Sequence, residues 1–209
     1  GTLEIPKDVY YGVQTTRALE NFPITKMTMH PELIRAFAIV KKSSALANAA
    51  IGQLDEKIAN AIALASDDII AGNLHDQFVV DPIQGGAGTS MNMNANEVIA
   101  NRALEILGEE KGSYSIISPN SHVNMAQSTN DAFPSAIHIA TVSTLDNLIM
   151  AMENMRDSFI QKSVEFDGIV KMGRTHLQDA VPVRLGQEFG AYAAVVARDI
   201  ARVKKAQQA

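Results

Sequence analysis

Apolar side chains recur at spacings of three, four, three and four along one stretch of this chain. They are Leu145, Leu148, Met152, Met155 and Phe159. This spacing is typical of the seam of a coiled coil or a helix bundle. The surrounding pattern predicts a helix over 131–165, which at about 1.5 Å per residue would be roughly 50 Å long. A helix of that length exceeds what one small domain needs, so we expect an extended bundle.

Helix start and stop signals divide the remainder of the sequence. Pro31 follows His30 at a helix start, and Asp55 precedes an apolar run that stops at Gly72. Gly108 closes an asparagine-rich segment. We therefore predict an all-α fold, with helices near 31–52, 55–71, 90–107, 131–165 and 185–208.

These helices group into two parts. Residues 1–130 predict an N-terminal helical domain, and residues 131–209 predict the first part of a central helix bundle. No substantial sheet is expected, although a short strand or hairpin is allowed near the N-terminus or around Phe78–Val80. The sequence stops at Ala209 within a helical pattern, without a capping residue or a glycine, so we expect a fragment of a longer protein.

Charge and composition limit the partners of the chain. The net charge of −5 gives no reason to expect nucleic acid or an anionic membrane. No apolar run approaches the roughly 20 residues that span a bilayer. The sequence has no cysteine, which excludes thiol nucleophiles and cysteine-ligated iron–sulfur clusters from these residues. We expect a cytoplasmic protein.

A glycine-rich loop, Gly85–Ser90, runs into a helix that contains Asn92, Asn94 and Asn96. Glycines let a backbone approach a ligand closely, and a helix N-terminus attracts anions, so Thr89 could bind a carboxylate. The pattern also fits an ordinary glycine loop with a Ser/Thr N-cap. The asparagines are poor helix formers and indicate a buried polar network.

A second polar segment, 118–131, precedes the long helix. Ser128, Thr129 and Asn130 offer neutral donors in series, which can hold a carboxylate and an amino group without a metal. The same residues also fit a helix N-cap, and the sequence leaves both interpretations open. His122 in this segment is either a base or a loop histidine, and the structural role is favoured.

The third polar segment, 173–182, is predicted as a loop between two bundle helices. It contains Thr175 and His176, and an imidazole here can donate or accept a proton near neutral pH. A lone loop histidine more often has no chemical role, and residue pattern alone favours that interpretation. The sequence lacks the serine-elbow, phosphate-loop and zinc-helix motifs of other enzyme classes.

Together with Ile5–Arg17 and Gly186–Phe189, the three segments resemble the aspartase/fumarase superfamily over nearly the whole chain. The resemblance implies an all-α fold in which a helical domain precedes a central bundle. It also implies a homotetramer whose active sites each take segments from three subunits. Such a site binds a small-molecule substrate without a cofactor or a metal.

Three places separate the aspartate ammonia-lyases from the class II fumarases. Class II fumarases typically carry Gly-Ser-Gly-Thr-Gln where this chain has Gly86–Ser90, Ser-Ser-Asn-Asp at Ser128–Asp131, and Ala-Thr-Pro at Ala180–Pro182. All three differences resemble the ammonia-lyases, which implies reversible deamination of L-aspartate to fumarate and ammonia. That reaction removes the Cβ proton and passes through an aci-carboxylate intermediate. The alternatives are fumarate/L-malate hydration and a helical assembly fragment without catalysis.

The resemblance also implies a role for each candidate residue. Thr89, Ser128, Thr129 and Thr175 would bind the β-carboxylate and stabilise the aci-carboxylate, while Asn130 and His176 would hold the amino group. In this family a serine on a mobile loop abstracts the proton, and this sequence lacks that loop. The long helix expected between Ser128 and Thr175 implies that each site combines residues of neighbouring subunits.

Overall fold

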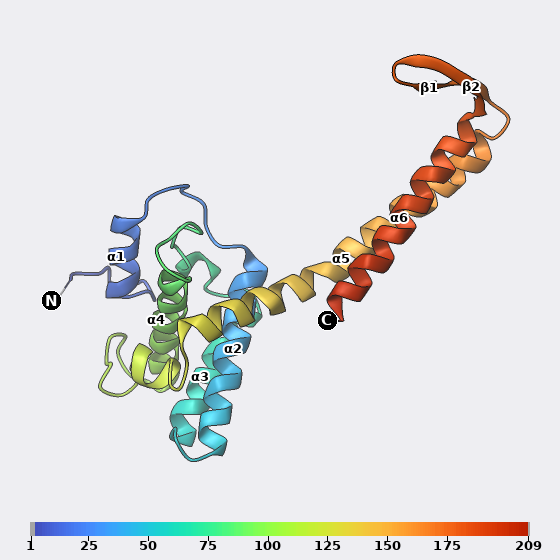
Figure 1. Ribbon diagram of the computed structural model, residues 1–209. Helices are drawn as coiled ribbons and strands as arrows, with labels where there is room; N and C mark the ends of the chain where they lie inside the picture. The colour runs from blue at the N-terminus through green and yellow to red at the C-terminus, as the bar shows by residue number, and fades with distance from the viewer. Residues whose placement is uncertain (1–2, 209) are drawn as a thin grey trace. The chain divides into compact units, whose positions relative to one another are not determined.

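A computed structural model describes residues 3–208 of the chain (Figure 1). The chain forms two compact units, Gly1–Thr141 and Val142–Ala209, and the long helix α5 (Thr129–Glu165) contributes to both. The sequence predicts that the second domain starts at residue 131. In the structure the first turns of α5 pack in the first unit, because Ala136 lies in its core. The division into two domains stays a prediction.

The first unit is helical, and its core lies between α2, α3 and α4. Figure 1 shows α2 and α3 side by side. Large apolar side chains such as Phe37, Ile62 and Ile99 are completely buried there. Besides the start of α5, the unit contains α1 (Val13–Asn21), α2 (Pro31–Ala50), α3 (Glu56–Ile70), the 3-10 turn η1 (His75–Gln77), α4 (Thr89–Ile106) and the π-helical turn η2 (Pro119–Val123).

The ends of α2, α3 and α4 follow from local signals. The ring of His30 accepts a hydrogen bond from the backbone N–H of Glu32 at 3.2 Å, and the carboxylate of Asp55 caps α3. Gly72 and Gly108 follow α3 and α4 with φ angles of 100° and 81°, which favour glycine. The predicted helices are confirmed here to within two residues at each end.

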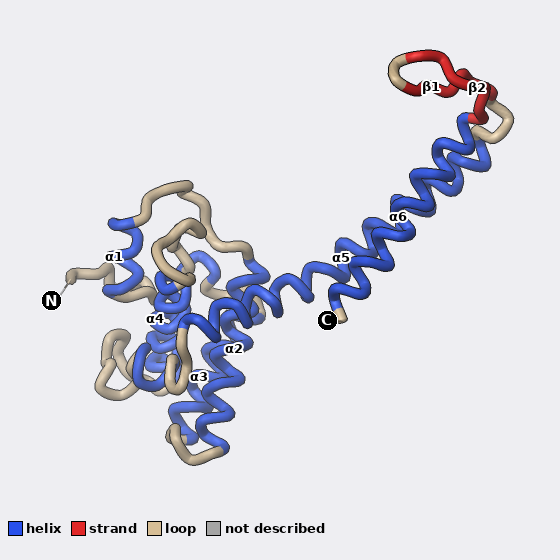
Figure 2. The backbone as a smooth tube through the Cα atoms, in the orientation of Figure 1, coloured by secondary structure: helices blue, strands red, loops and turns tan. Residues whose placement is uncertain are grey.

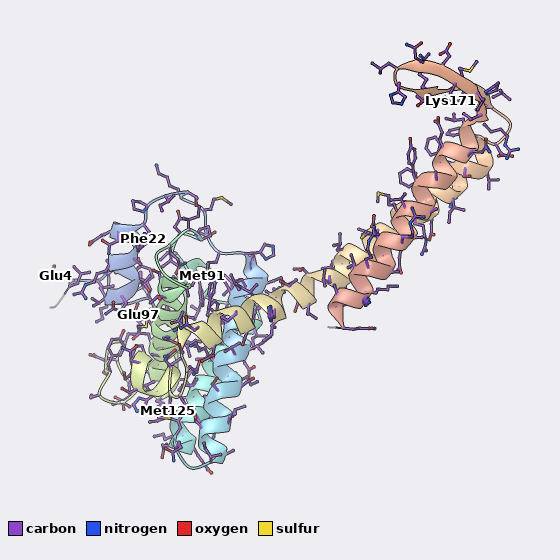
Figure 3. All side chains as sticks on the ribbon, in the orientation of Figure 1. Glu4, Phe22, Met91, Glu97, Met125 and Lys171 are labelled. Atoms are coloured by element: carbon purple, nitrogen blue, oxygen red, sulfur yellow. The ribbon has the colours of Figure 1, made fainter. Side chains whose placement is uncertain are left out.

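The sequence does not predict α1, because its capping group comes from another helix. Its N-cap, Gly12, has no side chain, and Glu97 of α4 replaces it. The Glu97 carboxylate accepts hydrogen bonds of 2.7–3.1 Å from the backbone of Gly12, Gln14 and Thr15 and from the Thr15 hydroxyl. Figure 3 shows Glu97 on α4, where its charge faces the positive end of the α1 dipole.

The second unit contains a β-hairpin where the sequence predicts a loop, so that prediction is wrong. Strands β1 (Val170–Thr175) and β2 (Gln178–Arg184) pair antiparallel and lead into α6 (Leu185–Gln207) (Figure 2). The connection is only His176 and Leu177, whose φ angles are 49° and 60°. Two-residue hairpin turns usually carry glycine, asparagine or aspartate, so this turn has no sequence signal. Phe78–Val80, where a strand is allowed, is not a strand.

The predicted seam is only partly correct. Met152 and Phe159 pack against α6 beside the buried Ile149, whereas Leu148 and Met155 are 47% and 45% exposed. The apolar positions of α5 therefore lie on more than one face, and the all-α class is confirmed apart from the hairpin. Within residues 3–208 no helix is both long and apolar enough to cross a membrane.

Candidate functional site

Thr89 lies in the first turn of α4. The N-cap of this helix is Gly88, in the left-handed region at φ 83°, and the side-chain oxygen of Gln84 caps the first turn by accepting from the backbone N–H of Met91 at 2.8 Å. The Thr89 hydroxyl is therefore not a capping group, and the residue is exposed. A helix N-terminus with an uncommitted hydroxyl is suited to bind an anion.

Ser128–Asn130 form the start of α5, and both interpretations of this segment have support. The Ser128 side-chain oxygen accepts a hydrogen bond from the backbone N–H of Asn130 at 3.2 Å, which is the geometry of an N-cap. The Thr129 hydroxyl accepts one from the side-chain amide of Asn92 at 3.1 Å. Because each hydroxyl acts as an acceptor in these bonds, its own hydrogen remains available to a ligand.

The structure brings Thr89 and Ser128–Asn130 together. Asn92, one turn after Thr89, reaches Thr129. Gly88 meets Phe133, one turn into α5, so closely that a Cβ atom at Gly88 would lie 2.2 Å from the ring. The N-termini of α4 and α5 are thus adjacent, and their dipoles and hydroxyl groups can act on one carboxylate.

Pro134 changes the hydrogen bonding of the same turn. It lies inside α5 and has no N–H, so it cannot donate to the carbonyl of Asn130, four residues earlier. The exposed side chain of Asn130 offers an amide oxygen to which an amino group could donate.

Thr175 and His176 belong to the second unit, where they form the end of β1 and the tip of the hairpin. Both are exposed, and Leu177 beside them is 95% exposed. Positive φ angles at His176 and Leu177 are costly for residues other than glycine. Such strain is concentrated at functional sites, which favours a functional role for this turn.

A cluster around Lys41 has no counterpart in the sequence analysis. Lys41 of α2 is completely buried, and its ammonium donates to the side-chain oxygens of Asn92 at 2.6 Å, Asn124 at 2.9 Å and Gln127 at 2.9 Å. Burial lowers the pKa of Lys41 to about 7. The residues that accept from Lys41 are distant from it in the sequence. Only the run of asparagines in α4 indicated that a buried polar network exists.

The predicted buried polar network of α4 is confirmed. Asn92, Asn94 and Asn96 are at most 1% exposed. Asn94 binds the segment before α4, because its side chain accepts from the backbone N–H of Val79 and donates to the carbonyl of Gln77. Asn92 instead lies between the Lys41 cluster and Thr129.

His122 has a local structural role, as favoured from the sequence. Its Nδ1 accepts a hydrogen bond from the backbone N–H of Ser118 at 2.8 Å, which holds the turn η2. A surface cavity of about 370 Å³ lies elsewhere, between the N-terminal segment and the turn at 109–112. No candidate residue lines that cavity. Within residues 3–208, no three His, Asp or Glu side chains are grouped as a metal site.

The chain is similar to several characterised lyases. All of residues 1–209 match the family described as Lyase. The chain is 66% identical to the aspartate ammonia-lyase of Bacillus sp, with 97% of the chain and 43% of that protein covered. It is 62% identical to the aspartate ammonia-lyase of Bacillus subtilis, with 100% of the chain and 44% of that protein covered.

Solved structures of lyases are also similar to this chain. The fold matches fumarate lyase:delta crystallin from Brucella melitensis with a TM-score of 0.93 and 51% identity, over 98% of this chain and 48% of that one. It matches a class II fumarase from Schistosoma mansoni with a TM-score of 0.90 and 33% identity, over 97% of this chain and 43% of the fumarase. The chain spans less than half the length of each of these relatives. It belongs to the lyase family, within the aspartase/fumarase superfamily.

Proposed function

We propose that this chain is part of an aspartate ammonia-lyase, which converts L-aspartate reversibly to fumarate and ammonia. The observation that supports this most directly is the 62–66% identity to the Bacillus aspartate ammonia-lyases over nearly all of the chain. Identity to the class II fumarase is 33%. An ammonia-lyase is also favoured over a fumarase by the sequence differences at Gly86–Ser90, Ser128–Asp131 and Ala180–Pro182.

The proposed reaction breaks one C–H and one C–N bond. A base outside these residues takes the Cβ proton, and the electron pair of that bond moves into the β-carboxylate to give the aci-carboxylate dianion. The pair then returns to form the Cα=Cβ bond as the Cα–N bond breaks and ammonia leaves. The family resemblance places the base on a serine loop.

Hydroxyl donors would stabilise the dianion. Thr89, Ser128 and Thr129 lie at two adjacent helix N-termini, and their hydroxyl hydrogens can point to a carboxylate whose charge grows in the transition state. Thr175 is assigned the same role from the second unit. Asn130 and His176 would hold the amino group, and the exposed position of Asn130 at the start of α5 supports this for Asn130.

We further propose a homotetramer whose active sites combine Thr89 and Ser128–Asn130 of one subunit with Thr175–His176 of another. The continuous α5, 37 residues long, supports this, because it separates the two groups of residues along the chain. Apolar side chains exposed on α5 and α6 also support an assembly, since monomers rarely leave such surface in water. They include Leu148, Met150, Met155, Ile160, Val164, Tyr192 and Val195. A cytoplasmic location fits the absence of cysteine.

An assay of the full-length enzyme tests the proposal. Purified protein is incubated separately with L-aspartate and with L-malate, and fumarate is followed by its absorbance. We expect fumarate from L-aspartate only. Fumarate from L-malate alone would identify a class II fumarase, and no product from either would favour an assembly role without catalysis.

A further inference from the structure

The amine of Lys41 is buried, and its nitrogen is surrounded by three neutral acceptors. An ammonium group has three N–H donors, and the three amide oxygens of Asn92, Asn124 and Gln127 lie at 2.6, 2.9 and 2.9 Å. Burying an unpaired charge is costly, so a structural role alone would be served better by an apolar side chain. The cluster therefore has another use.

The contact with Lys41 fixes which way the Asn92 amide points. Its oxygen faces the ammonium, and its NH2 group donates to Asn124 Oδ1 and to Thr129 Oγ1, each at 3.1 Å. The reverse orientation would place the NH2 group against the ammonium and the oxygen against the oxygen of Asn124. Lys41 thus holds Asn92 as a donor to Thr129.

The hydrogen bond that Asn92 donates to Thr129 determines how the Thr129 hydroxyl can bond to other groups. With its oxygen accepting from Asn92, the hydroxyl hydrogen must point elsewhere. Thr129 is half-buried at the start of α5, beside the exposed Ser128 and Asn130. The hydrogen is thereby directed to the place where a substrate carboxylate would bind.

The same cluster holds the segment before α5. Asn124 Oδ1 accepts from Lys41, Asn92 and Asn96, and Asn124 Nδ2 donates to the carbonyl of Gln127 at 3.0 Å. This ties residues 124–127 to α2 and α4. The position of the residues that follow, Ser128 above all, depends on that attachment.

We propose that Lys41 and Asn92 are positioning residues that fix the Thr129 hydroxyl as a hydrogen-bond donor to the substrate carboxylate. This role rests on the proposed function, since it requires Thr129 to contact the substrate. Neither Lys41 nor Asn92 touches the reacting atoms; both act through Thr129.

Asn92→Asp tests the orientation directly in the full-length enzyme. The new carboxylate keeps the shape of the amide and can pair with Lys41, but it cannot donate to Thr129. The Thr129 hydroxyl must then give its hydrogen to the carboxylate, away from the substrate. We expect kcat/KM to fall roughly 10- to 1000-fold, the range for loss of one transition-state donor.

A double-mutant cycle separates positioning from folding. Once Asn92→Asp has diverted the hydroxyl, adding Thr129→Ala should lower kcat/KM by less than about threefold more, because both changes remove the same donor. Two independent effects would multiply instead. Multiplying effects, or an unchanged kcat/KM in Asn92→Asp, would overturn the proposal.

Lys41→Met tests whether Lys41 sets the orientation of the Asn92 amide. It keeps an apolar stem but removes the ammonium, so the Asn92 amide is held in its orientation by Asn124 alone, and we expect a lower kcat/KM. Lys42→Met is the matched control, because Lys42 is the next residue of α2 and pairs with Asp67 near the surface. It should leave kcat/KM unchanged.

Asn94→Asp is the control for the buried site. Asn94 lies on the same helix and is equally buried, but it binds Val79 and Gln77 instead of Thr129. It should lower stability and leave kcat/KM of the folded enzyme unchanged. If neither Asn92→Asp nor Lys41→Met yields folded protein, the cluster serves folding and the proposal is wrong.

The unmodified enzyme is assayed first with L-aspartate and L-malate. Failure to act on L-aspartate refutes the proposed function, and the same variants are then compared with whichever substrate gives fumarate. An active unmodified enzyme with an unaffected Asn92→Asp variant refutes only the positioning role.

Discussion

The Glu97 carboxylate lies 2.7 Å from the hydroxyl of Thr15 and also accepts from the backbone N–H of Thr15 at 3.1 Å. One buried side chain of α4 thus supplies the N-terminal cap of α1. The N-terminal cap of α1 therefore depends on a single carboxylate.

Glu97→Gln should weaken the N-terminal cap of α1. The amide can accept at one position only, and its NH2 group would face N–H groups that now donate to a carboxylate. Loss of one hydrogen bond to a charged group costs about 1.5–3 kcal/mol. Hydrogen exchange of residues 13–21 should accelerate accordingly, whereas the exposed Glu56→Gln in α3 should leave it unchanged. Unaltered exchange would show that Glu97 is not the cap.

Gly88→Ala should destabilise the contact between α4 and α5. Its φ of 83° costs an L-residue about 1–2 kcal/mol, and the added Cβ would also meet the Phe133 ring at 2.2 Å. Gly108→Ala is the matched control, with a φ of 81° and nothing within 4 Å of its Cβ. Denaturant midpoints should fall further for Gly88→Ala, and only that variant should lose activity. Equal shifts of the two denaturant midpoints would mean that the Phe133 ring moves aside without a cost in stability.

Thr129→Ala should lower kcat/KM roughly 10- to 1000-fold while folding changes little. Asn92 Nδ2 keeps its bond to Asn124, and because Thr129 is only half-buried, water can replace the acceptor that the other N–H of Asn92 loses. Thr129→Ser, which retains the hydroxyl, should recover most activity, and the exposed Ser135→Ala of the same helix should be neutral. Unchanged activity with a stability loss of about 1 kcal/mol would support the capping interpretation of this segment.

Sharing of sites between subunits predicts complementation. Full-length Ser128→Ala and His176→Ala subunits should each be nearly inactive. Unfolded and refolded together, they should regain activity, because mixed tetramers contain some sites with neither substitution. Activity is measured with L-aspartate after mixed tetramers are demonstrated by differential tagging. No recovery in such tetramers would mean that each site is built within one chain.

Lys41 predicts a pH dependence of stability. Its pKa is about 7 in the folded chain and 10.5 ordinarily. Between these values the unfolded chain binds a proton that the folded chain lacks, so the contribution of Lys41 to stability rises with pH, by at most about 1.4 kcal/mol per unit. Below pH 7 both states are protonated and burial of the charge is a constant cost.

Denaturant midpoints of the unmodified protein and of Lys41→Met, compared between pH 7 and 9.5, measure this contribution. The groups that contact the amine are the neutral amides of Asn92, Asn124 and Gln127. A neutral amine still has two hydrogens, enough to donate to Asn92 and one other oxygen. A pH-independent difference between the proteins would mean that the three oxygens keep Lys41 charged.

Elements whose signals are local could be predicted from the order of the residues alone. Asp55 and Gly72 bracket α3, and Gly108 ends α4, because capping groups and positive φ angles act within a few residues. The three polar segments were also recognisable, since Thr89 and Ser128–Asn130 directly precede or begin helices. Their chemical roles came from a family resemblance and stay proposals.

Features that depend on partners far away in the sequence could be seen only in the folded chain. The cap of α1 is Glu97, from 82 to 85 positions away, and the acceptors of Lys41 lie 51 to 86 positions away. The hairpin turn at His176 and Leu177 is formed by residues that do not favour positive φ, so the strands on either side of it impose the turn. Local patterns report backbone preference, whereas burial of a charge and the direction of a hydroxyl depend on which surfaces meet when the chain folds.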